Sequence, residues 1–284
     1  MKNKIKTFVD PARLQRWCEA RRQEGRTIAL VPTMGYLHEG HLSLIAAARK
    51  RGVDEIVVSV FVNPVQFGPN EDYERYPRDE KADLAKCCAA GATAVFFPTP
   101  VNMYLEGHST YVEENSLSAG LCGARRPGHF RGVCTVVAKL FNIVHPHLAV
   151  FGQKDFQQAA VIRRMARDLN FDVKIVVAPI VREPSGLARS SRNTYLSEDE
   201  RIRATELSRA LRKVKHDVVA KGSVPWRGCR TSIVRSLEKA GLKVDYVEAV
   251  DAKSLIPVKT LVRGTVVLLA VWCGRTRLID NCVL

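Results

Sequence analysis

The segment from residue 30 to residue 44, LVPTMGYLHEGHLSL, most constrains the fold because it joins an apolar strand, a glycine turn and two histidines. The apolar run 27–31 is typical of a strand buried on both faces. Pro32 is predicted to end this strand, since proline cannot donate to a sheet ladder. Apolar residues recur at helical spacing after Gly40. Residues 33–39 are therefore predicted to form a strand-to-helix loop.

This loop is a candidate anion site. Backbone N–H groups at the beginning of a helix have no partner inside the helix, and they lie at the positive end of its dipole. His38 and His41 lie three residues apart, so one turn can present both imidazoles to the same group. As neutral donors or as imidazolium ions, they can hold phosphate oxygens during transfer. The pattern is equally consistent with two polar histidines that are exposed to solvent at the beginning of the helix and bind nothing.

The composition is that of a globular protein with anionic partners. A chain of 284 residues with 46% hydrophobic residues suits one large or two modest domains with a substantial core. The 44 Lys and Arg residues exceed the 29 Asp and Glu residues, giving a formal net charge of +15. This sign favours nucleotides, carboxylate metabolites or nucleic acid as partners. The basic residues are dispersed and lack interleaved aromatics, so no nucleic-acid surface is expected.

The cysteines and the apolar runs indicate a cytoplasmic protein. The eight cysteines include no C-x-x-C spacing, and several stand in apolar runs, so we expect buried thiols in a reducing compartment. Neither a zinc site nor a disulfide framework is predicted. The chain starts without an apolar signal region, and no run approaches the ~18 apolar residues of a membrane span, so no membrane association is expected.

Strand and helix patterns alternate up to residue 177, which predicts an α/β domain with a parallel sheet and helices on both faces. Ligands of such sheets bind beyond the carboxyl ends of the strands. The loop 182–186, REPSG, is the predicted domain boundary, separating 1–184 from a smaller α/β domain, 185–284. The predicted elements are strands at 27–31, 56–62, 94–97, 148–151, 173–177, 244–250 and 265–271, and helices including 79–90, 133–144, 198–220 and 226–240.

Two polar turns follow predicted strands. Asn63 and Gln66 are neutral amides that can pair with hydroxyl and carboxylate groups of a small substrate without burying a charge. A self-bonded turn at Asn63 is an equal alternative. In Gly152-Gln153-Lys154-Asp155, Lys154 can neutralise phosphate charge or be a solvated cation. Asp155 can ligate Mg²⁺ or cap the next helix, and capping is favoured for Asp155 alone.

Two further clusters carry hydroxyls and cations. Ser190, Ser191 and Arg192 follow the boundary loop and can bring donors to a triphosphate, although pattern alone slightly favours an ordinary linker. A basic cluster can meet pyrophosphate or a second subunit, and a solvated or interface role is favoured for it. Its members are Arg125, Arg126, His129 and Arg131.

Taken together, these segments resemble the pantoate–beta-alanine ligase (pantothenate synthetase) family. The resemblance rests on PTMGYLHEGH, FVNPVQF, RPGHFRGV, GQKDFQQ, GLARSSRN and RLIDN in this order along nearly the whole chain. It implies ATP-dependent condensation of (R)-pantoate with β-alanine to pantothenate, AMP and pyrophosphate through a pantoyl-adenylate. It also implies a Rossmann-like nucleotidyltransferase fold of the HIGH-motif superfamily, with a smaller C-terminal domain, a homodimer and Mg²⁺.

Residue roles carry over motif by motif. The resemblance implies catalytic roles for His38, His41, Lys154 and Arg192, with His41 as proton donor, and a mobile serine–arginine loop. Gln66 is implied to bind both pantoate and β-alanine, with Asn63 and Gln158 also at pantoate, and Asp155 is a candidate metal ligand. The implied ATP-binding residues are Met34, His38, His41, Gly152, Gln153, Lys154, Asp155, Val181, Ser190, Ser191 and Arg192.

Two residues depart from the family pattern, and two other functions remain open. Arg189 stands where an apolar Met or Leu is expected, and Cys122 replaces an acidic residue. A nucleotidyltransferase that transfers AMP to a phosphorylated acceptor would release pyrophosphate but no AMP. A basic nucleic-acid-binding module would show steep salt dependence and no ATP turnover.

Overall fold

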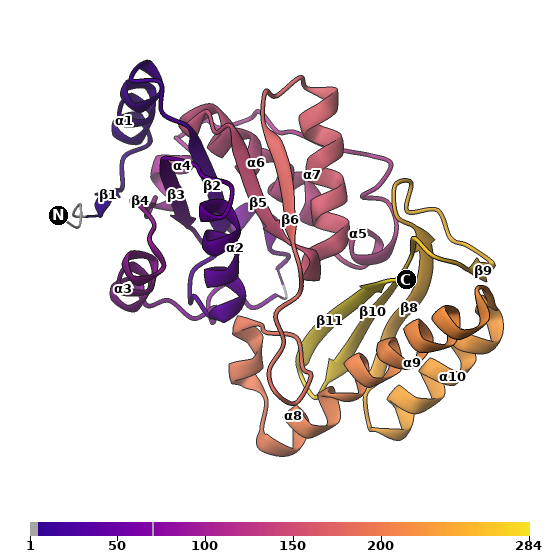
Figure 1. Cartoon of the computed structure of the whole chain (residues 1–284). Coiled ribbons are helices and arrows are strands. Elements are labelled where there is room, and N and C mark those ends of the chain that lie inside the picture. The colour runs from indigo at the N-terminus through magenta and orange to yellow at the C-terminus, as the bar shows by residue number, and fades with distance from the viewer. Residues whose placement is uncertain (1–4, 70) are drawn as a thin grey trace. The chain divides into compact units, whose positions relative to one another are not determined.

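The computed structural model describes residues 5–69 and 71–284, which form two compact units (Figure 1). The N-terminal unit comprises the described residues up to Gly152 together with Gln158–Ala178. The C-terminal unit comprises Gln153–Gln157 and Pro179–Leu284. The domain boundary after residue 184 stays a prediction. Among the described residues, no helix has both the length and the apolar character needed to cross a membrane.

A six-stranded parallel sheet organises the N-terminal unit, with the strand order β1-β4-β3-β2-β5-β6. Strands β2 to β4 follow one another to one side, and β5 and β6 continue on the other. The chain therefore changes direction between β2 and β5, where α/β sheets bind ligands at their carboxyl ends. The strands are β1 (Lys6–Phe8), β2 (Ile28–Thr33), β3 (Glu55–Val60), β4 (Ala94–Phe96), β5 (Leu148–Gly152) and β6 (Lys174–Ala178).

Strand β2 continues through Pro32 to Thr33, so the prediction that Pro32 ends it was wrong. On the β3 side, Pro32 lies opposite Ser59. On the β5 side, β2 pairs only at Ala29 and Leu30. Because the ladder on the β5 side has already ended, the missing N–H of Pro32 breaks no sheet hydrogen bond there.

Helices α2 (Glu39–Arg49) and α3 (Glu80–Ala90) contact one another and pack on the sheet, while α1 (Pro11–Gln23) packs against α6 (His129–Val144). Helix α6 begins earlier than the predicted residue 133. Gly128 has a positive φ of 80° at its N-cap, a conformation that glycine adopts without steric cost. This unit also contains α4 (Pro100–Met103), α5 (Leu121–Arg125), the 3₁₀ turn η1 (Pro64–Gln66) and all but the first two residues of α7 (Phe156–Asp168).

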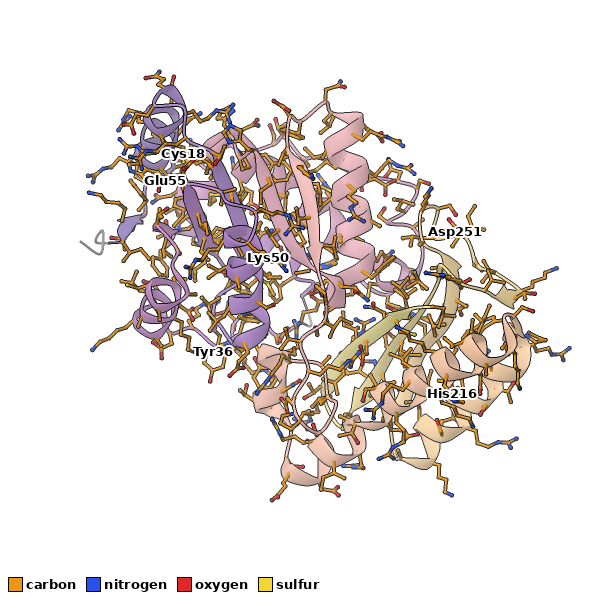
Figure 2. All side chains as sticks on the ribbon, in the orientation of Figure 1. Cys18, Tyr36, Lys50, Glu55, His216 and Asp251 are labelled. Atoms are coloured by element: carbon orange, nitrogen blue, oxygen red, sulfur yellow. The ribbon has the colours of Figure 1, made fainter. Side chains whose placement is uncertain are left out.

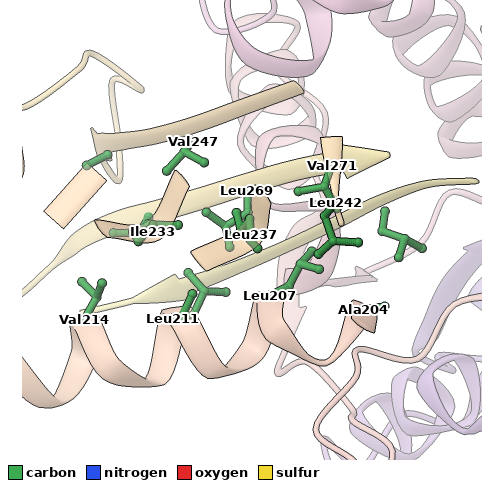
Figure 3. Packing of buried hydrophobic residues seen from close by; sticks show 14 of the residues in the cluster. Ala204, Leu207, Leu211, Val214, Ile233, Leu237, Leu242, Val247, Leu269 and Val271 are labelled. Atoms are coloured by element: carbon green, nitrogen blue, oxygen red, sulfur yellow. The ribbon is translucent and has the colours of Figure 1, made fainter. Parts of the chain in front are cut away.

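In the C-terminal unit, helices α9 and α10 pack against an antiparallel sheet in the order β11-β10-β8 (Figure 3). The predicted helix 198–220 is two helices that meet at Thr205, whose hydroxyl donates to the Ile202 carbonyl (2.7 Å). The elements are η2 (Gln153–Asp155), η3 (Ser191–Tyr195), α8 (Glu198–Ala204), α9 (Glu206–Lys221), β7 (Val224–Pro225), α10 (Trp226–Lys239), β8 (Lys243–Asp251), β9 (Thr260–Leu261), β10 (Thr265–Cys273) and β11 (Thr276–Val283).

Candidate active site

The turn between β2 and α2, here called the histidine turn (residues 33–41), lies at the carboxyl end of the sheet beside the switch point. The Thr33 hydroxyl donates to the Ser59 carbonyl (2.8 Å) and accepts the Gly35 N–H (3.2 Å). Gly35 and Tyr36 both have positive φ, 84° and 51°. Tyr36 is labelled at this turn in Figure 2. The strand therefore ends in a sharp reversal that delivers the chain to the first turn of α2.

The Nδ1 atom of each histidine accepts a hydrogen bond from a backbone N–H of the turn. His38 is the N-cap of α2, and its Nδ1 accepts the Gly40 N–H (3.1 Å). The Nδ1 of His41 accepts the His38 N–H (3.3 Å), and the two rings stack with centroids 4.1 Å apart. A nitrogen that accepts a hydrogen bond carries no proton, so both imidazoles are the neutral Nε2–H tautomer. Of the two charge states considered from the sequence, the geometry selects neutral donors.

Five backbone N–H groups of the expected anion site are already occupied by side chains. The N–H groups of Gly35, His38 and Gly40 donate to side chains within the turn. Those of Tyr36 and Leu37 donate to the carboxylate of a residue on α3. The prediction of free N–H groups was wrong for these five residues, because side chains of the turn accept three of them and a carboxylate of α3 accepts the other two. The histidine Nε2–H groups are the donors that this turn can direct towards a phosphate.

Asn63 is fully committed to holding a second turn, η1. Its Nδ2 donates to Gln66 Oε1 and to the Gly132 carbonyl, each at 3.1 Å. Its Oδ1 accepts the Tyr104 hydroxyl (2.7 Å) and the Val65 N–H (3.3 Å). These four bonds use both donors and both lone pairs of the amide. The self-bonded turn that the sequence left open is therefore confirmed, and pantoate binding by Asn63 stays a prediction.

Gln66, in contrast, keeps hydrogen-bonding capacity. It is 8% exposed, and its Nε2 donates to Met34 Sδ (3.1 Å), which joins this turn to the histidine turn. With one bond from Asn63 on Oε1, the amide retains one donor and one acceptor site. A Cβ at Gly132 would lie 2.6 Å from Gln66 Cα, so α6 packs directly on the backbone of this turn. The rigid support and the spare capacity suit a substrate-binding amide.

The basic cluster divides into buried and exposed members. Arg126 binds both oxygens of Glu71 (2.6 Å each) and contacts His129 Nε2 (2.9 Å), while His129 Nδ1 donates to the Gln66 carbonyl (2.9 Å). Although burial alone would raise it, the pKa of Glu71 is lowered by Arg126. The predicted solvated role was wrong for Arg126 and His129, which brace Gln66. Arg125 and Arg131 are exposed, and Arg131 lies 3.8 Å from the Tyr111 ring centroid.

In the C-terminal unit, Asn281 of β11 holds the turn η2, here called the lysine turn. Its Nδ2 donates to the carbonyls of Gln153 (2.9 Å) and Lys154 (3.0 Å), and Gln153 Nε2 donates back to its Oδ1 (3.3 Å). Among the described residues, neither the Lys154 ammonium nor the exposed Asp155 carboxylate has a hydrogen-bond or ion-pair partner. The favoured capping role of Asp155 was therefore wrong. Asn281 had one sequence indication, its place in RLIDN, which gave it no role.

The serine–arginine loop is anchored by Glu183. Ser190 caps η3 by accepting the Arg192 N–H (3.3 Å), and Ser191 is buried. Asn193 donates to Glu183 Oε1 (3.1 Å), and Arg201 binds both oxygens of Glu183. These contacts tie the beginning of the loop to the hairpin that precedes it.

The two departures from the family pattern have structural explanations. Arg189 forms an ion pair with Glu183 (3.6 Å), and its N–H donates to the Val181 carbonyl (2.9 Å). A cation at this position is therefore balanced by a carboxylate that already holds the loop. Cys122 is a buried thiol in α5, so no charge is exposed where an acidic residue was expected.

The predicted site residues fall into two sets. The N-terminal unit brings together the histidine turn and the amide turn through the Met34–Gln66 contact, and Gly152 ends β5 beside Leu44 of α2. Gln158 lies in α7 of the same unit. The C-terminal unit carries the second set, which consists of Gln153, Lys154, Asp155, Val181, Ser190, Ser191 and Arg192. Sequence reasoning missed Asp83, Glu71 and Glu183, the carboxylates that support these turns.

Comparisons with known proteins agree with this geometry. The sequence profile of the family described as Pantoate-beta-alanine ligase matches residues 6–283. A pantothenate synthetase of Anaeromyxobacter dehalogenans is 56% identical over 280 residues, which cover 96% of each chain. A crystal structure of pantothenate synthetase from Thermus thermophilus superposes with a TM-score of 0.89 at 43% identity, covering 98% of this chain and 99% of that one.

A further solved structure carries ligands. The pantoate-beta-alanine ligase of Francisella tularensis, described as complexed with beta-gamma ATP and beta-alanine, has a TM-score of 0.81 and 31% identity. The match covers 99% of this chain and 98% of that chain. The similarity therefore extends over both compact units.

Proposed function

This chain belongs to the family of pantoate-beta-alanine ligases, and we propose that it condenses (R)-pantoate with β-alanine at the expense of ATP. The products are pantothenate, AMP and pyrophosphate, and the intermediate is a pantoyl-adenylate. The observation that carries this proposal is the pair of stacked, neutral Nε2–H imidazoles at the switch point of a parallel sheet. Positioned donors of this kind stabilise charge that develops on phosphate oxygens.

In the first step, the pantoate carboxylate attacks the α-phosphorus of ATP, and the bond to pyrophosphate breaks. His38 and His41 donate hydrogen bonds from their Nε2–H groups to phosphate oxygens, and each ring keeps its proton. The neutral tautomer supports this hydrogen-bond role for His41 in place of the proton-donor role that the family resemblance implies. Lys154 and Arg192 supply permanent positive charge, which neutral imidazoles do not. The ammonium of Lys154, which has no hydrogen-bond or ion-pair partner within residues 5–69 and 71–284, supports this role. Met34, Gly152, Gln153, Val181, Ser190 and Ser191 complete the proposed ATP-binding set.

In the second step, the neutral amine of β-alanine attacks the acyl carbon of the adenylate, and AMP leaves. Gln66 orients both organic substrates with its remaining donor and acceptor, and Gln158 adds a second amide at pantoate. Asn63 contributes by fixing Gln66. Because an acyl-adenylate hydrolyses in water, the reaction requires a closed site, and the serine–arginine loop is the proposed lid.

A magnesium ion fits this site as a partner of the nucleotide. Mg²⁺ is usually held by one or two carboxylates together with substrate phosphates. Asp155 offers one exposed carboxylate next to Lys154, and the described residues contain no cluster of three His, Cys, Asp or Glu side chains that could bind a metal without a nucleotide. When bound, the ion neutralises phosphate charge.

The proposed assembly is a homodimer in the cytoplasm. Val101 and Leu105 are exposed apolar residues, 71% and 72%, near the irregular segment 109–115, and they suit a contact with a second copy. All eight cysteines are free thiols, as expected in a reducing compartment. Sedimentation analysis of the purified chain, with a Leu105→Glu variant as comparison, tests the dimer. A wild-type monomer at micromolar concentration would contradict it.

The decisive experiment is pantothenate formation from pantoate, β-alanine and Mg-ATP, with each component omitted in turn. We expect product only with the full set, and pyrophosphate release without β-alanine. Release of both AMP and pyrophosphate separates this ligase from an enzyme that transfers AMP to a phosphorylated acceptor. Pantothenate formation in the absence of ATP, or none with all components, would contradict the proposal.

A further inference from the structure

Helix α3 holds the backbone of the histidine turn through a buried carboxylate. Asp83 is 1% exposed, and its two oxygens accept the N–H groups of Tyr36 and Leu37, each at 2.7 Å. One helical turn later, the Lys86 ammonium donates to the Leu37 carbonyl (2.7 Å). Two charged side chains of α3 therefore bind both the donor and the acceptor groups of the residues directly before His38.

The turn that Asp83 holds is conformationally unfavourable by itself. Tyr36 has a φ of 51°, which residues with a side chain rarely adopt, and Gly35 has a φ of 84°. A Cβ on Gly35 would lie 3.0 Å from Asp83 Oδ2 and 2.9 Å from Val60 Cγ1. The carboxylate thus occupies the space that only a glycine leaves open. A left-handed pair of residues persists only where its surroundings determine it, and Asp83 is that determinant here.

The position of the turn decides how the imidazoles are presented. Leu37 is followed directly by His38, whose N–H donates to His41 Nδ1 and so sets the Nε2–H tautomer of His41. The Nδ1 of His38 itself accepts the Gly40 N–H, which sets the tautomer of His38. A shift of the backbone at Leu37 would break the bond from the His38 N–H to His41 Nδ1 first. Displacements of about 1 Å far from the reacting atoms can reduce rates about 100-fold.

We propose that Asp83 is a positioning residue for catalysis, assisted by Lys86. Its carboxylate fixes the backbone before His38, and this fixes the tautomer and the direction of both catalytic imidazoles. Asp83 touches no reacting atom and acts through the histidine turn. This inference rests on the proposed function in one respect: the step that Asp83 is expected to affect is formation of the acyl-adenylate.

The test is Asp83→Asn, which keeps the side-chain volume but can accept only one of the two N–H groups, since its NH₂ group faces the other. Glu80→Gln is the matched control, because Glu80 is an exposed residue of α3 and its replacement removes the same charge. We expect Asp83→Asn to lower the kcat of pyrophosphate release by about 10- to 100-fold and to leave the KM of β-alanine within about 2-fold. Glu80→Gln should match the wild type.

A spectroscopic readout separates positioning from general destabilisation. In ¹⁵N-histidine-labelled protein, His38 and His41 should show an unprotonated Nδ1 and a protonated Nε2 in the wild type and in Glu80→Gln. In Asp83→Asn, at a temperature where the protein is folded by circular dichroism, the tautomers should become mixed. Wild-type kinetics with unchanged tautomers in Asp83→Asn would overturn the proposal.

A second variant covers the case in which Asp83→Asn does not fold. Lys86→Met removes the part-buried contact that the exposed Lys86 makes with the Leu37 carbonyl, and it should lower kcat about 3-fold with partial tautomer mixing. An Nδ1–H tautomer of either histidine in the wild type would overturn the proposal without any variant. If the wild type makes no pantothenate but Asp83→Asn still mixes the tautomers, the proposed function fails and the positioning role stands.

Discussion

The histidine turn and the lysine turn are held in opposite ways. In the first, the Asp83 carboxylate accepts two adjacent backbone N–H groups. In the second, the Asn281 carboxamide donates to two adjacent backbone carbonyls. Each anchor is nearly fully buried and comes from an element remote in sequence. One turn thus has its donors occupied, and the other has its acceptors occupied.

This difference decides what each turn can offer an anion. With the N–H groups of residues 35–38 and of Gly40 taken, the histidine turn offers an anion its imidazole donors, and these are neutral. In the lysine turn, the bonds to Asn281 hold two carbonyl oxygens, which would otherwise repel a phosphate, and Lys154 carries a full charge. The neutral donors are fixed in place, whereas the permanent charge sits on a flexible side chain.

The largest expected effects come from removing the donor of either turn. His41→Ala and Lys154→Ala should each lower adenylate formation by about 100-fold or more, the scale of a preorganised charge stabiliser. His41→Gln should recover part of the loss, since an amide is also a neutral donor. Pyrophosphate release measures the effect, with His216→Ala and Lys213→Ala at exposed positions as controls. Near-wild-type release in both alanine variants would remove the basis of the comparison.

The next effect concerns the anchor of the lysine turn. Asn281→Asp replaces two donors with a buried charge that faces two carbonyls and lies next to Asp280, so we expect a loss of about 2–3 kcal/mol of unfolding free energy. The ATP kcat/KM should fall about 30-fold, because the turn moves. Urea unfolding and the pyrophosphate assay measure the two quantities. Asn142→Asp, an exposed change of the same kind, should alter neither.

The sequence predicted the parallel sheet and its ligand edge because strand and helix periodicities are local properties. It also identified the turns themselves, since glycine, proline and histidine mark them. It did not predict their anchors. Asp83 reads as a polar residue in an ordinary helix, and Asn281 as part of a strand. Their partners are separated from them by long stretches of chain, and only the fold brings these groups together.

The free backbone amides expected in the histidine turn illustrate the same limit. Helix geometry leaves such groups without partners inside the helix, and this much is local. Which side chain then satisfies them depends on tertiary packing, and here it is Asp83 of α3. Arg126 and His129 were misassigned for the same reason, because Glu71 lies in a loop with no recognisable pattern.

Gln66 tests whether spare hydrogen-bonding capacity marks a substrate ligand. Gln66→Ala should raise the KM of pantoate and of β-alanine about 10-fold, the loss expected for a hydrogen bond to a charged group, and leave the ATP KM nearly unchanged. Initial rates with each substrate varied in turn measure this, and Gln15→Ala on α1 is an exposed control. If only the ATP KM changes, the assignment of Gln66 to the organic substrates fails.

The smallest effect concerns His147, whose Nδ1 also accepts a backbone N–H but which has no proposed role in the reaction. At the amino end of β2, His147 Nδ1 accepts the Ile28 N–H (3.0 Å). Burial, and then the charge of Arg22, lower the pKa of His147 below its ordinary 6.5. The unfolded chain therefore binds more protons just below pH 6.5, so this contribution to stability is present above that pH and is lost as the pH falls.

Urea midpoints of the wild type and of His147→Gln, measured from pH 5 to pH 8, test this sign. The wild type should lose more stability than the variant on acidification, by a small margin because His147 is exposed. If the urea midpoint changes equally with pH in both proteins, protonation of His147 does not contribute to the pH dependence of stability. Activity at pH 8 should be the same in both, since the histidines proposed to contact ATP lie at the other end of β2.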